Sequence, residues 1–129
     1  MMSNNDLLKK ISISHNLQRI DVQEIFEMSN YELSTSQVSA LFAAEKNKNY
    51  EALTDSMLFG FLNSLIIYSR GSKNEPNVPP RSVLNSVLSL GQKEDTASLK
   101  VLQGFINDTI TSVEEGKFHE FRSDLLSED

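Results

Sequence analysis

The stretch that decides the fold is Asp55-Ser56-Met57-Leu58-Phe59-Gly60-Phe61-Leu62-Asn63-Ser64-Leu65-Ile66-Ile67-Tyr68-Ser69-Arg70. Its apolar residues recur three and four positions apart, which is the spacing of an α-helix, and they occupy more than half of the helix circumference. Thr54 or Asp55 can cap its start, and Gly71 after Arg70 suits its end. We therefore expect a central helix that is contacted from several sides.

Gly60 and Ser64 lie four positions apart in this segment. Small residues at this spacing allow another backbone to approach closely, although the motif is best attested in membranes. The apolar circumference and these two small residues together indicate a helix that takes part in close packing or in self-association.

Three shorter helical patterns precede the central one. The first covers about residues 4–16 and can be capped by Ser3 or Asn4. Asp21 can cap the second, and Ser34 opens the third because its spacing to Gln37 is that of a capping box. Leu7, Leu8 and Ile11 carry the helical spacing of the first helix. The apolar residues expected inside the other two are Val22, Ile25, Phe26, Val38, Leu41 and Phe42. Residues 45–53 are polar and predict a loop that is anchored by Tyr50.

Three further helical patterns follow a linker. Residues 72–80 contain all three prolines and show no apolar periodicity. Beyond them we expect a helix that Gly91 ends, a helix over about 95–113 and a last helix over about 115–126. No segment alternates like a strand with hairpin turns. The sequence therefore predicts an all-α chain, a compact bundle of about six to seven helices.

The charge and the cysteine content of the chain indicate which kinds of binding partner and which cellular compartment to expect. The chain has 129 residues with twelve basic and eighteen acidic side chains, a formal charge of -6. This balance disfavours nucleic acid and anionic membranes. The absence of cysteine excludes thiolate chemistry and favours a reducing compartment. With no signal peptide pattern and no apolar run long enough to span a bilayer, the sequence predicts a soluble, cytoplasmic protein.

The first seventy residues resemble the YehS-like family, a group of bacterial proteins without an established activity. The resemblance rests on motifs that keep their order and spacing, which are Asn4 to Lys10, Asp21 to Phe26, Leu33 to Leu41, Asn49-Tyr50, Asp55, Phe61 to Ile66 and Arg70-Gly71. This chain departs from the family pattern in three places. Leu53-Thr54 stand where a cysteine usually precedes the aspartate, Ser64 stands for glycine, and Glu45-Lys46 replace an acidic pair.

The resemblance implies a helical unit over residues 1–71. Typical members carry two tandem copies of the unit, but residues 81–129 do not repeat residues 4–70 in a clear register. We therefore expect a linker over 72–80 and, over 81–129, a helical extension or a diverged second copy that packs on the first unit. The resemblance implies no activity, cofactor or ligand.

No catalytic arrangement is readable. The two histidines, His15 and His119, are far apart, so the spacing of a helical zinc pair is absent. The chain contains no nucleophile elbow, phosphate-binding loop or calcium loop. We therefore predict neither enzyme activity, nor a metal, nor a cofactor.

Two groups of polar residues are candidate binding sites. Around the start of the central helix the candidates are Asn49, Tyr50, Asp55, Asn63 and Arg70. Such a cluster could bind a small ligand, whose identity the sequence does not specify. Helix caps and loop packing explain each residue without a ligand and are favoured.

The second group belongs to the helix pair over residues 21–43, which has the order of a helix-turn-helix. The residues that would face a DNA groove are Thr35, Ser36, Gln37 and Ser39, and Lys46 and Lys48 could contact phosphates. Net charge and the lack of arginine or lysine in the recognition segment disfavour this alternative. The leading hypothesis is a helical interaction module that binds a protein partner or a second copy of itself.

Overall fold

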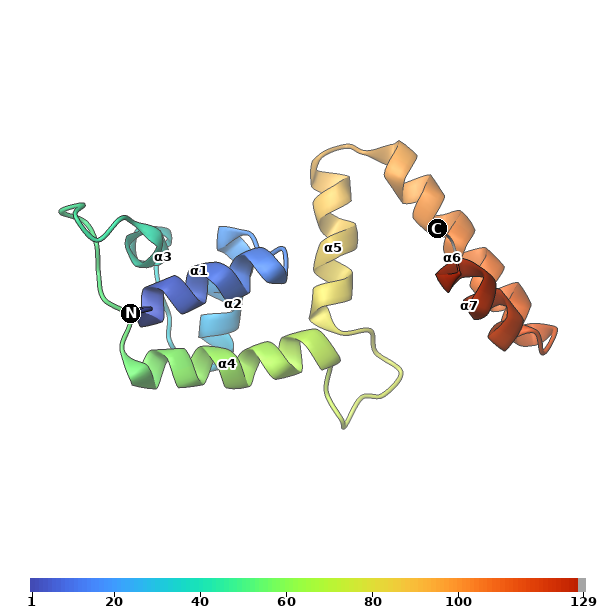
Figure 1. Cartoon of the computed structure of the whole chain (residues 1–129), viewed down its shortest axis with the longest axis horizontal. Coiled ribbons are helices and arrows are strands. Elements are labelled where there is room, and N and C mark those ends of the chain that lie inside the picture. The colour runs from blue at the N-terminus through green and yellow to red at the C-terminus, as the bar shows by residue number, and fades with distance from the viewer. Residues whose placement is uncertain (128–129) are drawn as a thin grey trace. The chain divides into compact units, whose positions relative to one another are not determined.

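The computed structural model describes residues 1–127, and in this part of the chain the secondary structure consists of seven helices without a strand (Figure 1). The helices are α1 (Asn4–Ser14), α2 (Arg19–Met28), α3 (Thr35–Phe42), α4 (Asp55–Arg70), α5 (Arg81–Gln92), α6 (Thr96–Glu114) and α7 (Phe118–Leu126). The prediction of an all-α chain with six to seven helices is confirmed. None of these helices, over the residues described, is both long and apolar enough to cross a membrane.

The chain divides into two compact units, Met1–Asn85 and Ser86–Asp129, which we call the N-terminal and C-terminal units. The division falls inside α5 rather than in the proline-containing segment over 72–80. The N-terminal unit extends this far because Arg81 and Asn85, in the first turns of α5, bond to side chains of α2 and α4.

The N-terminal unit contains a continuous apolar core. Helix α4 contacts α1 and α2, and α3 packs on both of these shorter helices (Figure 1). The Phe26 and Phe61 rings lie 4.9 Å apart at the centre and are fully buried. The buried apolar residues of this unit are Leu8, Val22, Ile25, Phe26, Val38, Leu41, Leu53, Leu58, Phe61, Leu65 and Tyr68.

Helix α4 is buried on one side only. Phe59, Ile66 and Ile67 are more than half exposed, so contact from several sides was a wrong expectation for this helix. The reason is that α1 and α2 pack on the opposite side, and the first turns of α5 bond to α4 only near its end, at Ser69 and Tyr68. At Gly60 the close neighbours are the side chains of Tyr31 and Ser29 rather than another backbone, since a Cβ there would lie 2.9 Å from Tyr31 Cε2.

Helix boundaries follow the expected caps with three corrections. Ser3, Ser34 and Thr54 cap α1, α3 and α4 as predicted, and Gly71 ends α4 at a φ of 84°. Helix α2 begins at Arg19, not at Asp21, because the Asp21 carboxylate accepts a hydrogen bond from the Gln18 backbone N–H at 2.8 Å.

The other two corrections concern glycines. Helix α5 runs through Gly91 to Gln92, because Gly91 keeps helical geometry and the positive φ comes later, at Glu94. Helix α7 begins at Phe118 rather than at residue 115, because Gly116 has a φ of 71° and interrupts the helical path. A glycine can join a helix or end it, and the sequence pattern does not distinguish the two.

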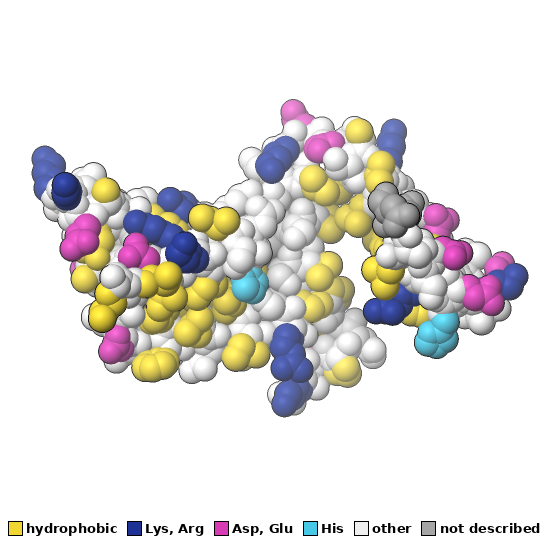
Figure 2. All heavy atoms as spheres, in the orientation of Figure 1, with side chains coloured by type: hydrophobic (Ala, Val, Ile, Leu, Met, Phe, Trp, Pro, Cys, Tyr) yellow, Lys and Arg dark blue, Asp and Glu magenta, His cyan; other side chains and the backbone are white. Residues whose placement is uncertain are grey.

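The C-terminal unit is built differently. Helix α6 packs on α7, with the Phe105 and Phe121 rings 6.1 Å apart. Among the described residues of this unit no apolar side chain is buried. The one residue buried there is polar, Ser112. Figure 2 shows hydrophobic side chains at the surface over α5 and α6.

Candidate functional site

Asn5 joins α1 to the loop that precedes α4. Its side chain is 2% exposed. The Nδ2 group donates to the carbonyls of Leu41 and Glu51, both at 2.9 Å, and Oδ1 accepts from the Leu53 N–H at 2.8 Å and the Tyr50 hydroxyl at 3.1 Å. All four hydrogen-bonding positions of the amide are therefore used inside the fold.

The residues predicted around the start of α4 lie in three places. Tyr50 bonds to Asn5, and the Asp55 carboxylate accepts a 2.7 Å hydrogen bond from Asn4, so these two side chains tie the loop to α1. Asn63 and Arg70 lie exposed farther along α4. Arg70 lies fifteen residues after Asp55, about 22 Å along a helix axis. Asn49 lines a groove beside α3.

The residues of the nucleic-acid alternative lie together. Thr35, Ser36, Gln37 and Ser39 are exposed and line one groove of about 650 Å³. Its other lining residues are Ala40, Ala43, Asn47, Asn49 and Glu51. Lys46 and Lys48 are exposed in the same loop as Asn47 and Asn49. The groove therefore offers hydroxyl and amide groups, with one carboxylate at Glu51.

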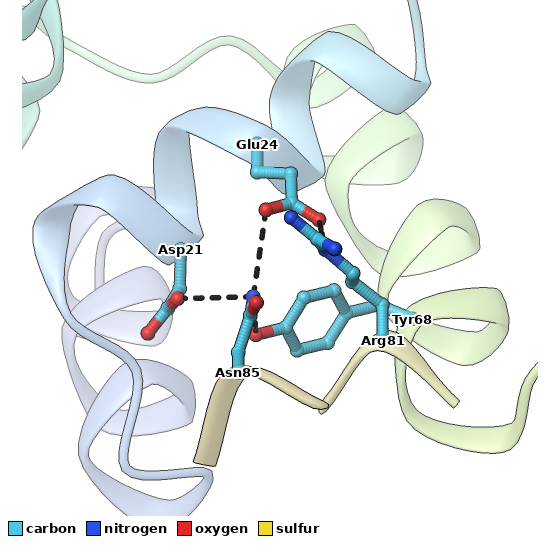
Figure 3. A network of polar contacts seen from close by, with 5 residues as sticks. All are labelled: Asp21, Glu24, Tyr68, Arg81 and Asn85. Atoms are coloured by element: carbon cyan, nitrogen blue, oxygen red, sulfur yellow. Dashed lines mark hydrogen bonds and ion pairs between the residues drawn. The ribbon is translucent and has the colours of Figure 1, made fainter. Parts of the chain in front are cut away.

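A polar network that sequence reasoning missed connects α2, α4 and the start of α5 (Figure 3). Asn85 Nδ2 lies 2.8 Å from the Tyr68 hydroxyl, 3.2 Å from the Asp21 carboxylate and 3.4 Å from that of Glu24. Arg81 Nε donates to Glu24 Oε2 at 2.8 Å. Its members lie up to 64 positions apart, so no local pattern indicates it.

The network fixes the start of α5 on the N-terminal unit. Burial raises the pKa of the Tyr68 phenol, and the nearby Asp21 and Glu24 carboxylates raise it further, while the Asn85 hydrogen bond opposes the increase. The Glu24 carboxylate raises the pKa of the Arg81 guanidinium. Tyr68 is only 3% exposed, so the network holds its hydroxyl inside the N-terminal unit, whereas the side chains of Arg81 and Glu24 are 50% and 30% exposed.

Tyr68 predicts a loss of stability at alkaline pH. Its folded pKa lies above the ordinary value of 10.0, so the folded state favours the protonated phenol. The stabilisation is complete below pH 10 and is lost as the pH rises from there towards the folded pKa. In urea unfolding followed by circular dichroism, the free energy of unfolding should fall more between pH 8 and pH 10.5 for the unaltered chain than for Tyr68→Phe. Equal slopes for the two proteins would contradict this assignment.

A second surface lies on α6, where five apolar residues follow helical spacing. We call Leu99, Leu102, Ile106, Ile110 and Val113 the apolar stripe. Ile106, Ile110 and Val113 are 48%, 49% and 58% exposed. Leu99, Leu102 and Ile106 also line a groove of about 430 Å³ together with Val87 of α5. Part of the stripe thus forms one wall of a groove within the C-terminal unit.

The four helices α1 to α4 lie within residues 4–71, the segment that places the chain in a protein family. The chain belongs to the family described as "Protein of unknown function (DUF1456)", whose model matches residues 4–71. This confirms the resemblance to the YehS-like family that the motifs of residues 4–71 indicate.

A curated relative extends the similarity past this unit. The chain is 26% identical over 100 residues to "Uncharacterized protein YehS" of Escherichia coli (strain K12). That match covers 77% of this chain and 64% of the relative, so the chain spans less than two thirds of the relative's length. The match covers 100 residues, which is more than the 71 residues up to Gly71. Part of the chain after Gly71 is therefore also similar to the relative. No solved structure matches the chain.

Proposed function

We propose that this protein is a helical interaction module that binds another protein chain through its C-terminal unit. One observation carries the proposal. Every buried apolar side chain in the described residues belongs to the N-terminal unit, whereas the C-terminal unit exposes at least ten large apolar residues. The ten are Val87, Leu88, Val101, Phe105, Ile106, Ile110, Val113, Phe118, Leu125 and Leu126.

The energetics of burial support a protein partner. Removing apolar surface from water yields about 25 cal/mol per Å², and a unit without a buried core does not gain this free energy by itself. Leu99, Leu102 and Ile106 line one groove together with Val87, and contiguous exposed apolar surface is typical of sites that contact other proteins. The absence of cysteine fits action in the reducing cytoplasm, which we propose as the compartment.

The test is site-specific photo-crosslinking in living cells. A photoreactive amino acid placed at Ile106 should give one discrete cross-linked product. The control position is Gly104, two residues away on another side of α6, where an added side chain would meet nothing within 4 Å. A product at Ile106 that is absent at Gly104 supports the proposal. No product at Ile106, or equal products at both positions, overturns it.

A second candidate function is binding of nucleic acid through α3. What favours it is the grouping of Thr35, Ser36, Gln37 and Ser39 along one exposed groove, with Lys46 and Lys48 in the adjoining loop. The net charge of -6 opposes it. Gel retardation of duplex DNA at low salt tests it, because electrostatic binding is strongest there. Retardation that disappears in a Lys46→Glu, Lys48→Glu chain would support this candidate, and no retardation would exclude it.

A small-ligand site around Tyr50 and Asp55 is not proposed further. Both side chains are engaged with Asn5 and Asn4 in the loop attachment. The hydrogen bonds of the fold therefore account for the two residues that had suggested a ligand.

A further inference from the structure

The segment that follows Gly71 lies on the N-terminal unit without a buried residue of its own. Residues 72–85, which we call the strap, comprise the proline-containing loop and the first turns of α5. Each of them is exposed or half-buried, whereas Tyr68, which the strap covers near the end of α4, is 3% exposed. The strap therefore covers a side chain of the core without adding one to it.

Apolar packing beneath the strap is incomplete. Residues of α2, α4 and the strap line a groove of about 200 Å³. The apolar and aromatic side chains along it are Met28, Ile67, Tyr68, Val78, Pro79, Pro80 and Leu84. Ile67 and Val78 are 53% and 51% exposed, so much of their surface stays in water. Because burial of apolar surface is what stabilises such a contact, the groove holds the strap only weakly.

Polar contacts hold the strap in place (Figure 3). Arg81 Nε donates to Glu24 Oε2 at 2.8 Å, and Asn85 Nδ2 lies 2.8 Å from the Tyr68 hydroxyl. The Arg81 and Glu24 side chains are 50% and 30% exposed, and water and salt screen an ion pair as exposed as this one. A few side-chain contacts at the surface therefore keep the strap on the end of α4.

We propose that the strap opens as a unit while α1 to α4 stay folded, with Gly71 as its hinge. Every buried apolar residue of the described chain lies before Gly71, so opening leaves these four helices packed together. Gly71 has a φ of 84°, and a residue without a Cβ can change its backbone angles at low cost. Opening moves the Tyr68 hydroxyl from beneath the strap into water. The strap is thus a cover that the fold can release without unfolding.

Ionisation of Tyr68 after a jump to alkaline pH measures the opening in the full-length chain. Hydroxide removes the proton of a phenol beneath the strap only after the strap opens. Stopped-flow mixing from pH 8 to pH 12 should therefore give a phase of phenolate absorbance that is slower than mixing, and Tyr68→Phe should lack this phase.

The contacts of the strap should set the rate of the Tyr68 phase. Asn85→Ala removes the hydrogen bond to Tyr68 and should raise the rate by a factor of up to about ten. Arg81→Ala removes the ion pair with Glu24 and should raise the rate by a factor of up to about five. Asn77→Ala, at an exposed position of the strap, is the matched control and should leave the rate unchanged.

Two substitutions in α3 separate opening of the strap from unfolding of the unit. Val38 and Leu41 are buried in the core, and α3 packs on α1 and α2, so Val38→Ala and Leu41→Ala weaken the core away from the strap. Neither should change the rate of the Tyr68 phase. If both raised it as much as Asn85→Ala does, Tyr68 would be reached only through unfolding, and the proposal would be overturned.

Two other results would also overturn the proposal. Ionisation of Tyr68 within the mixing time would mean that the strap does not cover the hydroxyl. A rate that neither Asn85→Ala nor Arg81→Ala raises would mean that these contacts do not hold the strap closed. None of these outcomes bears on cross-linking at Ile106, which tests the proposed function.

Discussion

Phe61→Ala is expected to lower the free energy of unfolding of the N-terminal unit by about 3–5 kcal/mol. Phe61 is fully buried, and its ring lies 4.9 Å from that of Phe26 at the centre of the core. Truncation removes the transfer free energy of the ring and leaves a cavity that the surrounding helices fill only in part. Urea unfolding followed by circular dichroism measures the change, with the urea dependence checked for two-state behaviour.

Phe59→Ala is the matched control. It makes the same substitution two residues earlier in α4, but Phe59 is 66% exposed. We expect a change within about 0.5 kcal/mol, because alanine also has the higher helix propensity. Similar losses in the two variants would mean that the exposed side of α4 is covered in solution, and the one-sided burial described above would then be wrong.

Asn5→Ala is expected to destabilise the same unit by about 2–5 kcal/mol. The substitution removes the donor and the acceptor of the buried amide at once, so the Leu53 N–H and the Leu41 carbonyl both lose their bonds to it. A buried polar group without a partner costs about 1–3 kcal/mol, which makes a single polar residue as important as a core phenylalanine.

Two comparisons sharpen this experiment. Tyr50→Phe removes one hydrogen bond to Asn5 and should lower the free energy of unfolding by about 0.5–1.5 kcal/mol. Asn63→Ala replaces an exposed asparagine within α4 and should change stability by less than about 0.5 kcal/mol. If Asn5→Ala proved as mild as Asn63→Ala, the loop before α4 would be held by contacts other than this amide.

The candidate sites were predictable to different degrees. The residues of the α3 groove could be grouped from sequence, because Thr35, Ser36, Gln37 and Ser39 lie within one short helix. The cluster from Asn49 to Arg70 could not, because its members lie at opposite ends of a sixteen-residue helix and in the loop before it. Residues close in the sequence lie together in the α3 groove because they belong to one short helix and the loop that follows it.

The contacts of the Tyr68 network could not be predicted from the sequence. Asn85 donates to Asp21 across 64 positions and to Tyr68 across 17. In the sequence, Asp21 suggests the cap of a helix that in fact begins at Arg19, and no local pattern singles out Asn85 as a partner of Asp21 or Tyr68. Their meeting depends on how α2, α4 and α5 pack, which is set by contacts remote in the sequence.

The sequence by itself determined the seven helices, most of their caps and the apolar residues of the N-terminal core. These follow from periodicity and from hydrogen bonds between residues three or four positions apart, as at Ser34 and Gln37. The tertiary structure alone decided which apolar faces are buried. Phe61 and Ile106 both occupy apolar positions of amphipathic helices, yet one lies in a core and the other is 48% exposed. Periodicity specifies that a helix has an apolar face. Which neighbours cover that face depends on how the helices pack, and this involves residues far apart in the sequence.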